Sequence, residues 1–160
     1  MIPKNDLLNI FQKEFATTLK VMKAYPKDKI DFSPHERSQK AKRLMSTFIF
    51  EMYLLRSYLF GEKVDRSVFQ QYNKETLDEL IADFQSETSK VIDLIQKSGN
   101  EILNKQVQFA GVNFEGGNFA MMMLFDQIHH RGQLSVYIRM IGGKVPSIYG
   151  PSADDSSTNL

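Results

Sequence analysis

The sequence predicts an all-α protein, a four-helix bundle with a short extended arm or hairpin before the last helix. Four segments carry apolar residues at three- and four-residue steps, most of them end in recognisable capping signals, and joints of medium length connect them. With 160 residues, 42% of them hydrophobic, the chain has the size of one domain. We therefore expect residues 1–160 to form a single unit, with a loose polar tail over residues 152–160.

The first helix is expected between Pro3 and Pro26, and it should stop at Tyr25 or just before. The second follows a polar linker, where Ser33-Pro34-His35-Glu36 has the form of a capping box. We expect this helix to begin there or after a short turn at Ser38, and to end at Gly61. The predicted apolar stripes are Leu8, Phe11, Phe15, Leu19 and Met22 in the first helix, and Ala41, Leu44, Met45, Phe48, Met52, Leu55 and Leu59 in the second.

Residues 62–75 show no sustained period, which indicates a loop with a partial turn. Thr76-Leu-Asp-Glu79 is a second capping box, and it should start a third helix that Ser98-Gly99-Asn100 ends. The stripe of this helix is Leu77, Leu80, Ile81, Phe84, Val91, Ile92 and Ile95.

Residues 107–114 partly alternate between apolar and polar side chains around Gly111, which is typical of a short hairpin. Such an arm must pack on something to persist. The last helix is expected after Gly116-Gly117-Asn118, and it should run to Ile141 before Gly142-Gly143 closes it.

The most informative stretch of the chain lies in this last helix, where Asp126 and His130 stand four residues apart. That spacing places a carboxylate and an imidazole on one helix face. At about 100° per residue, Gln133 and Tyr137 fall in the same sector, and Met123 flanks it. We expect the sector to face inward, so these side chains become candidate pocket residues.

Two neighbours of this sector point elsewhere. His129 lies to one side of it, and we expect this residue at a rim or an interface. Arg131 lies more than a quarter-turn away, so we expect it to pair with an acidic residue or with the chain tail.

The stretch from His130 to Asp154, which begins HRGQLSVYIRMIGGKVP and continues SIYGPSAD, resembles the last helix and tail of the DinB/YfiT-like superfamily, the DNA-damage-inducible DinB family. The resemblance implies a four-helix bundle and, in many members, a divalent metal held by three histidines. It matches His130 with the third histidine, Asp126 with the second, and Thr47, or Ser46 one residue earlier, with the first. Two of the three metal histidines are therefore replaced. The family name refers to induction by DNA damage and implies no contact with DNA.

The altered residues leave two alternatives. Three imidazoles would suit zinc or nickel, whereas Asp126, His130 and Glu51, one turn after Thr47, would form a harder site that suits manganese, iron or magnesium. Alternatively, Asp126 accepts a hydrogen bond from His130 or Thr47 in a cluster without metal, which is the reading that the residue types favour. The Asp–His pair could also act as a general base without metal.

Composition narrows the other function classes. The chain has no cysteine, which excludes thiolate ligands and a cysteine nucleophile. A formal net charge of +1 gives no support for nucleic-acid binding, and we interpret the basic cluster Arg37, Lys40, Lys42 and Arg43 as a solvated helix face. No segment resembles a signal peptide or a membrane span, so a cytoplasmic protein with no membrane partner is expected.

Three functions remain, and whether the protein is an enzyme stays open at this point. The resemblance implies descent from metal-dependent transferases or hydrolases that activate a thiol or water. The alternatives are a non-catalytic protein that binds a small ligand and a structural homodimer. Self-association is expected from the resemblance and from the apolar surplus of Phe48, Phe50 and Tyr53 on the second helix.

Overall fold

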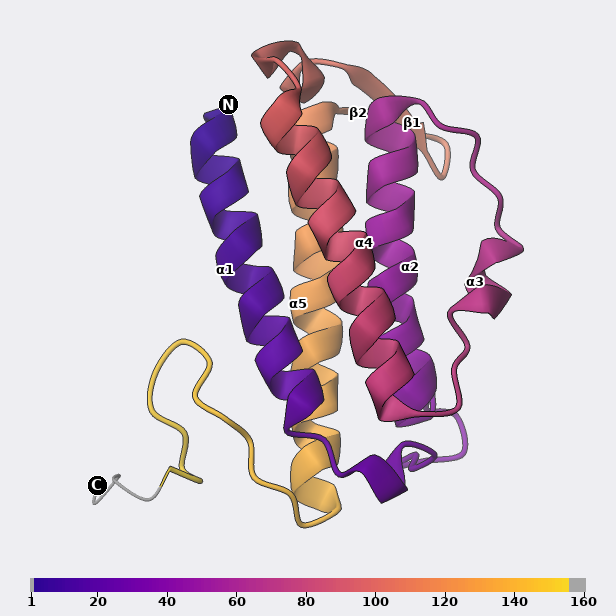
Figure 1. Ribbon diagram of the computed structural model, residues 1–160, viewed down its shortest axis with the longest axis vertical. Helices are drawn as coiled ribbons and strands as arrows, with labels where there is room; N and C mark the ends of the chain where they lie inside the picture. The colour runs from indigo at the N-terminus through magenta and orange to yellow at the C-terminus, as the bar shows by residue number, and fades with distance from the viewer. Residues whose placement is uncertain (1, 156–160) are drawn as a thin grey trace.

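The computed structural model describes residues 2–155 and shows a bundle of four long helices (Figure 1). These are α1 (Lys4–Lys23), α2 (Ala41–Phe60), α4 (Leu77–Lys97) and α5 (Gly116–Met140). Helices α1 and α2 each pack against both α4 and α5, so α5 lies between α1 and α2 on one side of the bundle. The short elements are η1 (Lys27–Lys29), the one-turn helix α3 (Val68–Gln71), η2 (Asn100–Leu103), β1 (Gln106–Phe109) and β2 (Val112–Glu115). The expected all-helical bundle with a hairpin before the last helix is thus confirmed.

Helix α2 begins later than the first of the two predicted starts. The Ser33 hydroxyl donates to the carbonyls of His35 and Ser38, so this segment forms turns and not a capping box. The helix starts at Ala41, whose N–H bonds to the Phe32 carbonyl, and the linker folds back to supply this acceptor. Because the linker satisfies the first free N–H groups, the helix needs no side-chain cap. Gly61 ends α2 in the left-handed conformation (φ 73°), as expected.

The second capping box is confirmed. The Thr76 hydroxyl accepts a hydrogen bond from the Glu79 N–H, and the Glu79 carboxylate accepts one from the Thr76 N–H. Helix α4 follows at once and ends at Lys97, directly before Ser98. Local sequence therefore determines where this helix begins and ends.

The hairpin is an antiparallel pair in which Val107 faces Phe114, and Gly111 (φ 81°) occupies its turn. Strand β2 runs directly into α5, which starts at Gly116, three residues earlier than predicted. A Cβ on Gly116 would lie 2.2 Å from the backbone oxygen of Ile102, so only glycine fits this helix start. The arm persists because it packs on the bundle, where Phe109 contacts Phe119 of α5.

Helix α5 buries only part of the predicted face: Met123 and Tyr137 are buried, whereas Asp126 is exposed. Gln127 and Arg131 are fully buried, whereas the side chain of Asp126 is 55% exposed. The sector with Asp126 and His130 therefore lies along the junction with α2 and not at the bundle centre. The prediction was wrong for Asp126 because α5 carries apolar residues around its whole circumference, so the sequence pattern does not identify the inner face.

Arg131 forms the contacts expected of it. Its guanidinium lies 2.8 Å from the Glu14 carboxylate of α1 and donates to the Tyr149 hydroxyl in the tail. Tyr149 in turn donates to Glu14. One buried arginine thus joins α1, α5 and the C-terminal segment.

The tail is ordered further than predicted. Asp154 accepts a hydrogen bond from the Val145 N–H and pairs with Arg139, and Ser152 is buried and donates to the Val145 carbonyl. Residues 152–155 are therefore held against the bundle, and a loose tail from residue 152 was wrong for them. Residues 156–160 lie outside the described part of the chain.

The three aromatic residues that motivated a dimer are covered within the chain. Phe48 is fully buried, Tyr53 is 7% exposed, and the ring of Phe50 lies 4.8 Å from that of Phe69 in α3. The Arg43 guanidinium lies over the Phe69 ring, 3.5 Å from the ring centroid. Residues 62–75 thus cover apolar side chains of α2 that would otherwise face solvent. None of the described helices is both long and apolar enough to cross a membrane.

Candidate functional site

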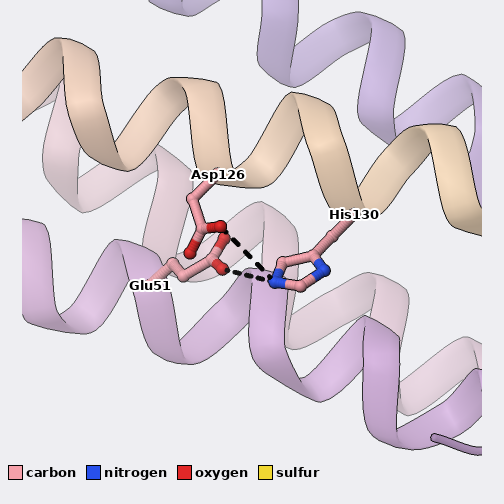
Figure 2. A group of neighbouring side chains, drawn as sticks. All are labelled: Glu51, Asp126 and His130. Carbon is pink, nitrogen blue, oxygen red and sulfur yellow. Dashed lines mark ion pairs between the residues drawn. The ribbon is translucent and has the colours of Figure 1, made fainter. Parts of the chain in front are cut away.

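Glu51 of α2 meets Asp126 and His130 of α5 at the junction of the two helices (Figure 2). Each residue contributes one potential ligand atom, and these atoms all lie within 4.8 Å of one another. Nε2 of His130 is 3.6 Å from Glu51 Oε1 and 3.7 Å from Asp126 Oδ1. The four-residue spacing on α5 and the packing of α2 against α5 together create this cluster.

The Glu51 carboxyl group is the unusual member. Its side chain is only 4% exposed, and neither oxygen has a hydrogen-bond partner among the described residues. Burial raises the pKa of Glu51 well above its ordinary value, and the charge of Asp126 raises that pKa further. Burying a carboxyl group without hydrogen bonds is costly unless the group is protonated or binds a cation.

Gln133 connects the two histidines of α5. Its Oε1 lies 3.1 Å from His130 Nδ1, and its Nε2 lies 3.0 Å from His129 Nε2. In this arrangement the Gln133 oxygen accepts a hydrogen bond from His130 Nδ1, and Nε2 is the nitrogen that faces the two carboxyl groups. A metal-binding histidine is usually held in this way by a hydrogen bond at its other nitrogen.

The hydrogen bonds predicted for a metal-free cluster are not formed. The Thr47 hydroxyl donates to the Arg43 carbonyl one turn earlier in its own helix, at 3.1 Å. The 3.7 Å separation of His130 and Asp126 is longer than a hydrogen bond. Thr47 still faces the same cavity as Glu51 and Asp126, as the resemblance implied for the position of the first histidine.

A cavity of about 570 Å³ opens beside the cluster. Glu51 and Asp126 lie on its wall, and Met123, a predicted pocket residue, lines it as well. No pattern in the sequence indicated that other elements contribute to this wall. Its remaining lining residues are Thr47, Phe50, Leu54, Phe109, Met122, Phe125 and His129.

His130 lines a second cavity, of about 450 Å³. Gln133 and Tyr137, the two remaining predicted pocket residues, line it together with Arg37 of the α1–α2 linker. The Tyr137 hydroxyl donates to the Gln39 carbonyl and so holds the linker against α5. The predicted pocket residues are therefore divided between two cavities, and His130 lines only the second.

The donor set fits a divalent cation. One imidazole nitrogen and two carboxyl groups on a facing pair of helices resemble the sites that hold iron or manganese and leave positions for other ligands. The unpartnered oxygens of Glu51 and the orientation of His130 are what such an ion requires. Among residues 2–155, this is the one group of three or more such side chains close enough to share an ion.

The sequence has recognisable relatives. A model of the DinB family matches residues 1–159. The uncharacterized protein YrdA of Bacillus subtilis (strain 168) is 31% identical over 88 residues, which are 54% of this chain and 53% of YrdA, so the match spans about half of that relative. The uncharacterized protein YjoA of the same organism is 23% identical over 145 residues, or 89% of this chain and 93% of YjoA.

Solved structures share the fold. A DinB-like protein from Bacillus cereus ATCC 10987 superposes with a TM-score of 0.79 at 19% identity, over 89% of this chain and 95% of that one. The crystal structure of Bacillus subtilis YjoA gives 0.71 at 22% identity, over 89% and 97%. A mycothiol-dependent maleylpyruvate isomerase gives 0.68 at 12% identity, over 83% of this chain and 61% of that one. The family model covers nearly the whole sequence, and the chain therefore belongs to the DinB family.

Proposed function

We propose that this protein is a metal-dependent enzyme whose Glu51, Asp126 and His130 hold one divalent cation of the manganese or iron type. The reaction class is a transfer or hydrolysis that begins with activation of water or a thiol. One observation carries the proposal: neither oxygen of the buried Glu51 carboxyl group has a hydrogen-bond partner among the described residues, and Oε1 lies 3.6 Å from Nε2 of His130.

The cation would lower the pKa of a bound water or thiol, so that a nucleophile forms near neutral pH. The protein's own residues supply the rest. Gln133 holds the imidazole of His130 in the orientation that aims Nε2 at the carboxyl groups. The apolar walls of the adjoining cavity exclude water from the reacting group.

The fold is compatible with an enzyme but assigns no reaction. The mycothiol-dependent maleylpyruvate isomerase is a thiol-dependent enzyme with a similar fold, but fold alone does not determine chemistry. The absence of cysteine means that any thiol involved would come from a small molecule.

Calorimetric titration of the purified, chelator-treated protein with Mn²⁺ tests the proposal. We expect saturable binding of one ion per chain, weakened at least tenfold in Glu51→Gln and in His130→Ala. The matched control is Glu87→Gln, because Glu87 is an equally buried glutamate of α4 that pairs with Lys90 outside the cluster. Heat signals that do not saturate, or equal binding by wild type and Glu51→Gln, would contradict the assignment.

A second candidate is a binding protein that has lost catalysis and keeps the cavity. The size and apolar lining of the cavity favour it, since ligand sites usually measure about 300–1,000 Å³. Elemental analysis of freshly purified protein separates the two candidates. If the protein binds small ligands, contains no metal and takes up none, the second candidate, a non-catalytic binding protein, is correct.

We also propose that the chain forms a homodimer, for which the support is now the family resemblance alone. Sedimentation velocity at micromolar concentration should show a species of twice 18.4 kDa. A single species at the monomer mass would exclude it.

A further inference from the structure

The cavity beside Glu51 and Asp126 differs in character from the rest of the site. Six of its lining residues are apolar: Phe50, Leu54, Phe109, Met122, Met123 and Phe125. They come from α2, from the hairpin strand β1 and from α5, so three elements that are distant in sequence build one wall. Three aromatic rings and two flexible methionine side chains are suited to a flat apolar molecule.

The charges around the cavity have one sign. Glu51 and Asp126 lie at one end, and no lysine or arginine is among the described residues that line it. The arginine of this region, Arg37, lines the second cavity, as His130 does. A negatively charged molecule would lose its hydration and meet two carboxyl groups without a compensating cation. Even with a divalent ion bound, the ion and the two carboxylates would sum to no net positive charge.

The cavity is accessible from solvent. Phe125 at its rim is 60% exposed, although it is a large apolar residue, and the Asp126 side chain beside it is 55% exposed. The Phe50 ring on the opposite wall is held from behind by Phe69. A ligand could therefore enter past Phe125 and reach Glu51 without displacing the bundle core.

We infer that the substrate is an uncharged small molecule with an aromatic or similarly flat apolar body, which fills this cavity and presents a neutral oxygen-containing group to Glu51 and Asp126. The assignment of the reacting end rests on the proposed function. The assignment of the apolar body rests only on the lining, the charge and the accessibility of the cavity.

A pair of probes with the same ring system tests this. The chelator-treated protein is titrated with 1-naphthalenemethanol, which is neutral, and with 1-naphthoate, which is an anion. We expect the alcohol to bind at least tenfold more tightly. Equal or tighter binding of the carboxylate would overturn the inference.

Variants locate the binding. Leu54→Trp fills the cavity and should weaken binding of the alcohol at least tenfold. Phe125→Ala, at an exposed position that cannot disturb the core, should weaken it severalfold. The matched control is Ile92→Trp, because Ile92 is a half-buried aliphatic residue that lines a separate groove between α1 and α4. Binding that Ile92→Trp weakens, and that Leu54→Trp and Phe125→Ala leave unchanged, would place the probe elsewhere and refute the inference.

The Mn²⁺ titration keeps this inference separate from the proposed function. Binding of Mn²⁺ without binding of either probe would refute the apolar substrate and leave the metal site standing. Binding of the alcohol without binding of Mn²⁺ would support the cavity assignment and refute the metal-dependent reaction.

Discussion

Gln133 fixes His130: the amide oxygen of Gln133 lies 3.1 Å from Nδ1 of the imidazole, one helical turn away on α5. Replacement by leucine should remove this acceptor and let the ring rotate and change tautomer. We expect Mn²⁺ affinity to fall about 10–100-fold, as is typical when the hydrogen bond behind a metal-binding histidine is lost.

Nitrogen NMR of the imidazole provides the readout that a general loss of stability would not give. In wild type, His130 should be the Nδ1–H tautomer, and in Gln133→Leu it should become a mixture. His129→Ala is the control, because it removes the other partner of Gln133 and leaves the bond to His130 intact. A His130 tautomer that is unchanged by Gln133→Leu would show that the glutamine does not position the ring.

Restoring the family histidines should strengthen the site. Thr47 and Asp126 line the same cavity from α2 and α5, so Thr47→His with Asp126→His adds two imidazoles beside His130. We expect the double variant to bind Ni²⁺ or Zn²⁺ far more tightly than wild type. Calorimetry with Ni²⁺ measures this, with the two single variants as controls. No gain in the double variant would mean that Thr47 does not stand at the position of the first histidine.

Removal of the buried charge at Arg131 should lower the free energy of unfolding. Arg131→Leu leaves the Glu14 carboxylate, which is 14% exposed, without its cation and releases Tyr149. We expect a loss of about 3–5 kcal/mol in the free energy of unfolding, measured by urea denaturation. Arg139→Leu is the matched control, because Arg139 pairs with Asp154 while 54% exposed and should cost less than about 1 kcal/mol. Equal losses in the two variants would contradict this account.

The capping box at Thr76 should contribute measurably to α4. Thr76→Ala removes the acceptor for the Glu79 N–H, and we expect unfolding to become easier by about 0.5–2 kcal/mol. Thr17→Ala in α1 serves as the control, because the Thr17 hydroxyl bonds only to the Lys13 carbonyl of its own helix. That change should be neutral or slightly stabilising. If Thr17→Ala lowered the stability and Thr76→Ala did not, the capping box would not contribute to the stability of α4.

The tail should depend on pH in the acid range. The hydrogen bond from the Val145 N–H, followed by the pairing with Arg139, holds the pKa of Asp154 below its ordinary value of 3.8. A lowered pKa in the folded state contributes stability that is present above the unfolded value and is lost as the pH falls through the folded one. We therefore expect the tail contacts to weaken below about pH 4.

Urea denaturation at pH 5 and pH 3 tests this with Asp154→Asn as the reference. Wild type should be the more stable protein at pH 5, and its advantage should shrink at pH 3 because the carboxylate is becoming protonated there. An advantage that grows on acidification would contradict the assigned direction of the pKa.

Short-range signals in the sequence determined most of the fold. The box from Thr76 to Glu79 started α4, Gly61 ended α2, and the alternation around Gly111 formed the hairpin, because each depends on neighbours a few residues away. The four-residue spacing of Asp126 and His130 likewise brings the two side chains together on one helix face, independently of how the helices pack.

Packing decided what the sequence could not. Because α5 has apolar residues on every side, the surfaces of α1 and α2 determine which of its faces is buried. In the folded protein Arg131 is buried and Asp126 is exposed. The start of α2 was set by carbonyl groups of the folded-back linker, and not by the apparent capping box at Ser33.

For the candidate site, too, the sequence and the tertiary structure determined different features. The sequence by itself determined which chemical groups are present: one carboxylate and one imidazole on α5, a glutamate one turn after Thr47 on α2, and no thiolate. Only the tertiary structure decided that the Glu51 carboxyl group is buried without a partner and that Phe109 of the hairpin joins the cavity wall. Burial and long-range contact arise from the packing of elements far apart in the chain, and no local spacing of residues specifies them.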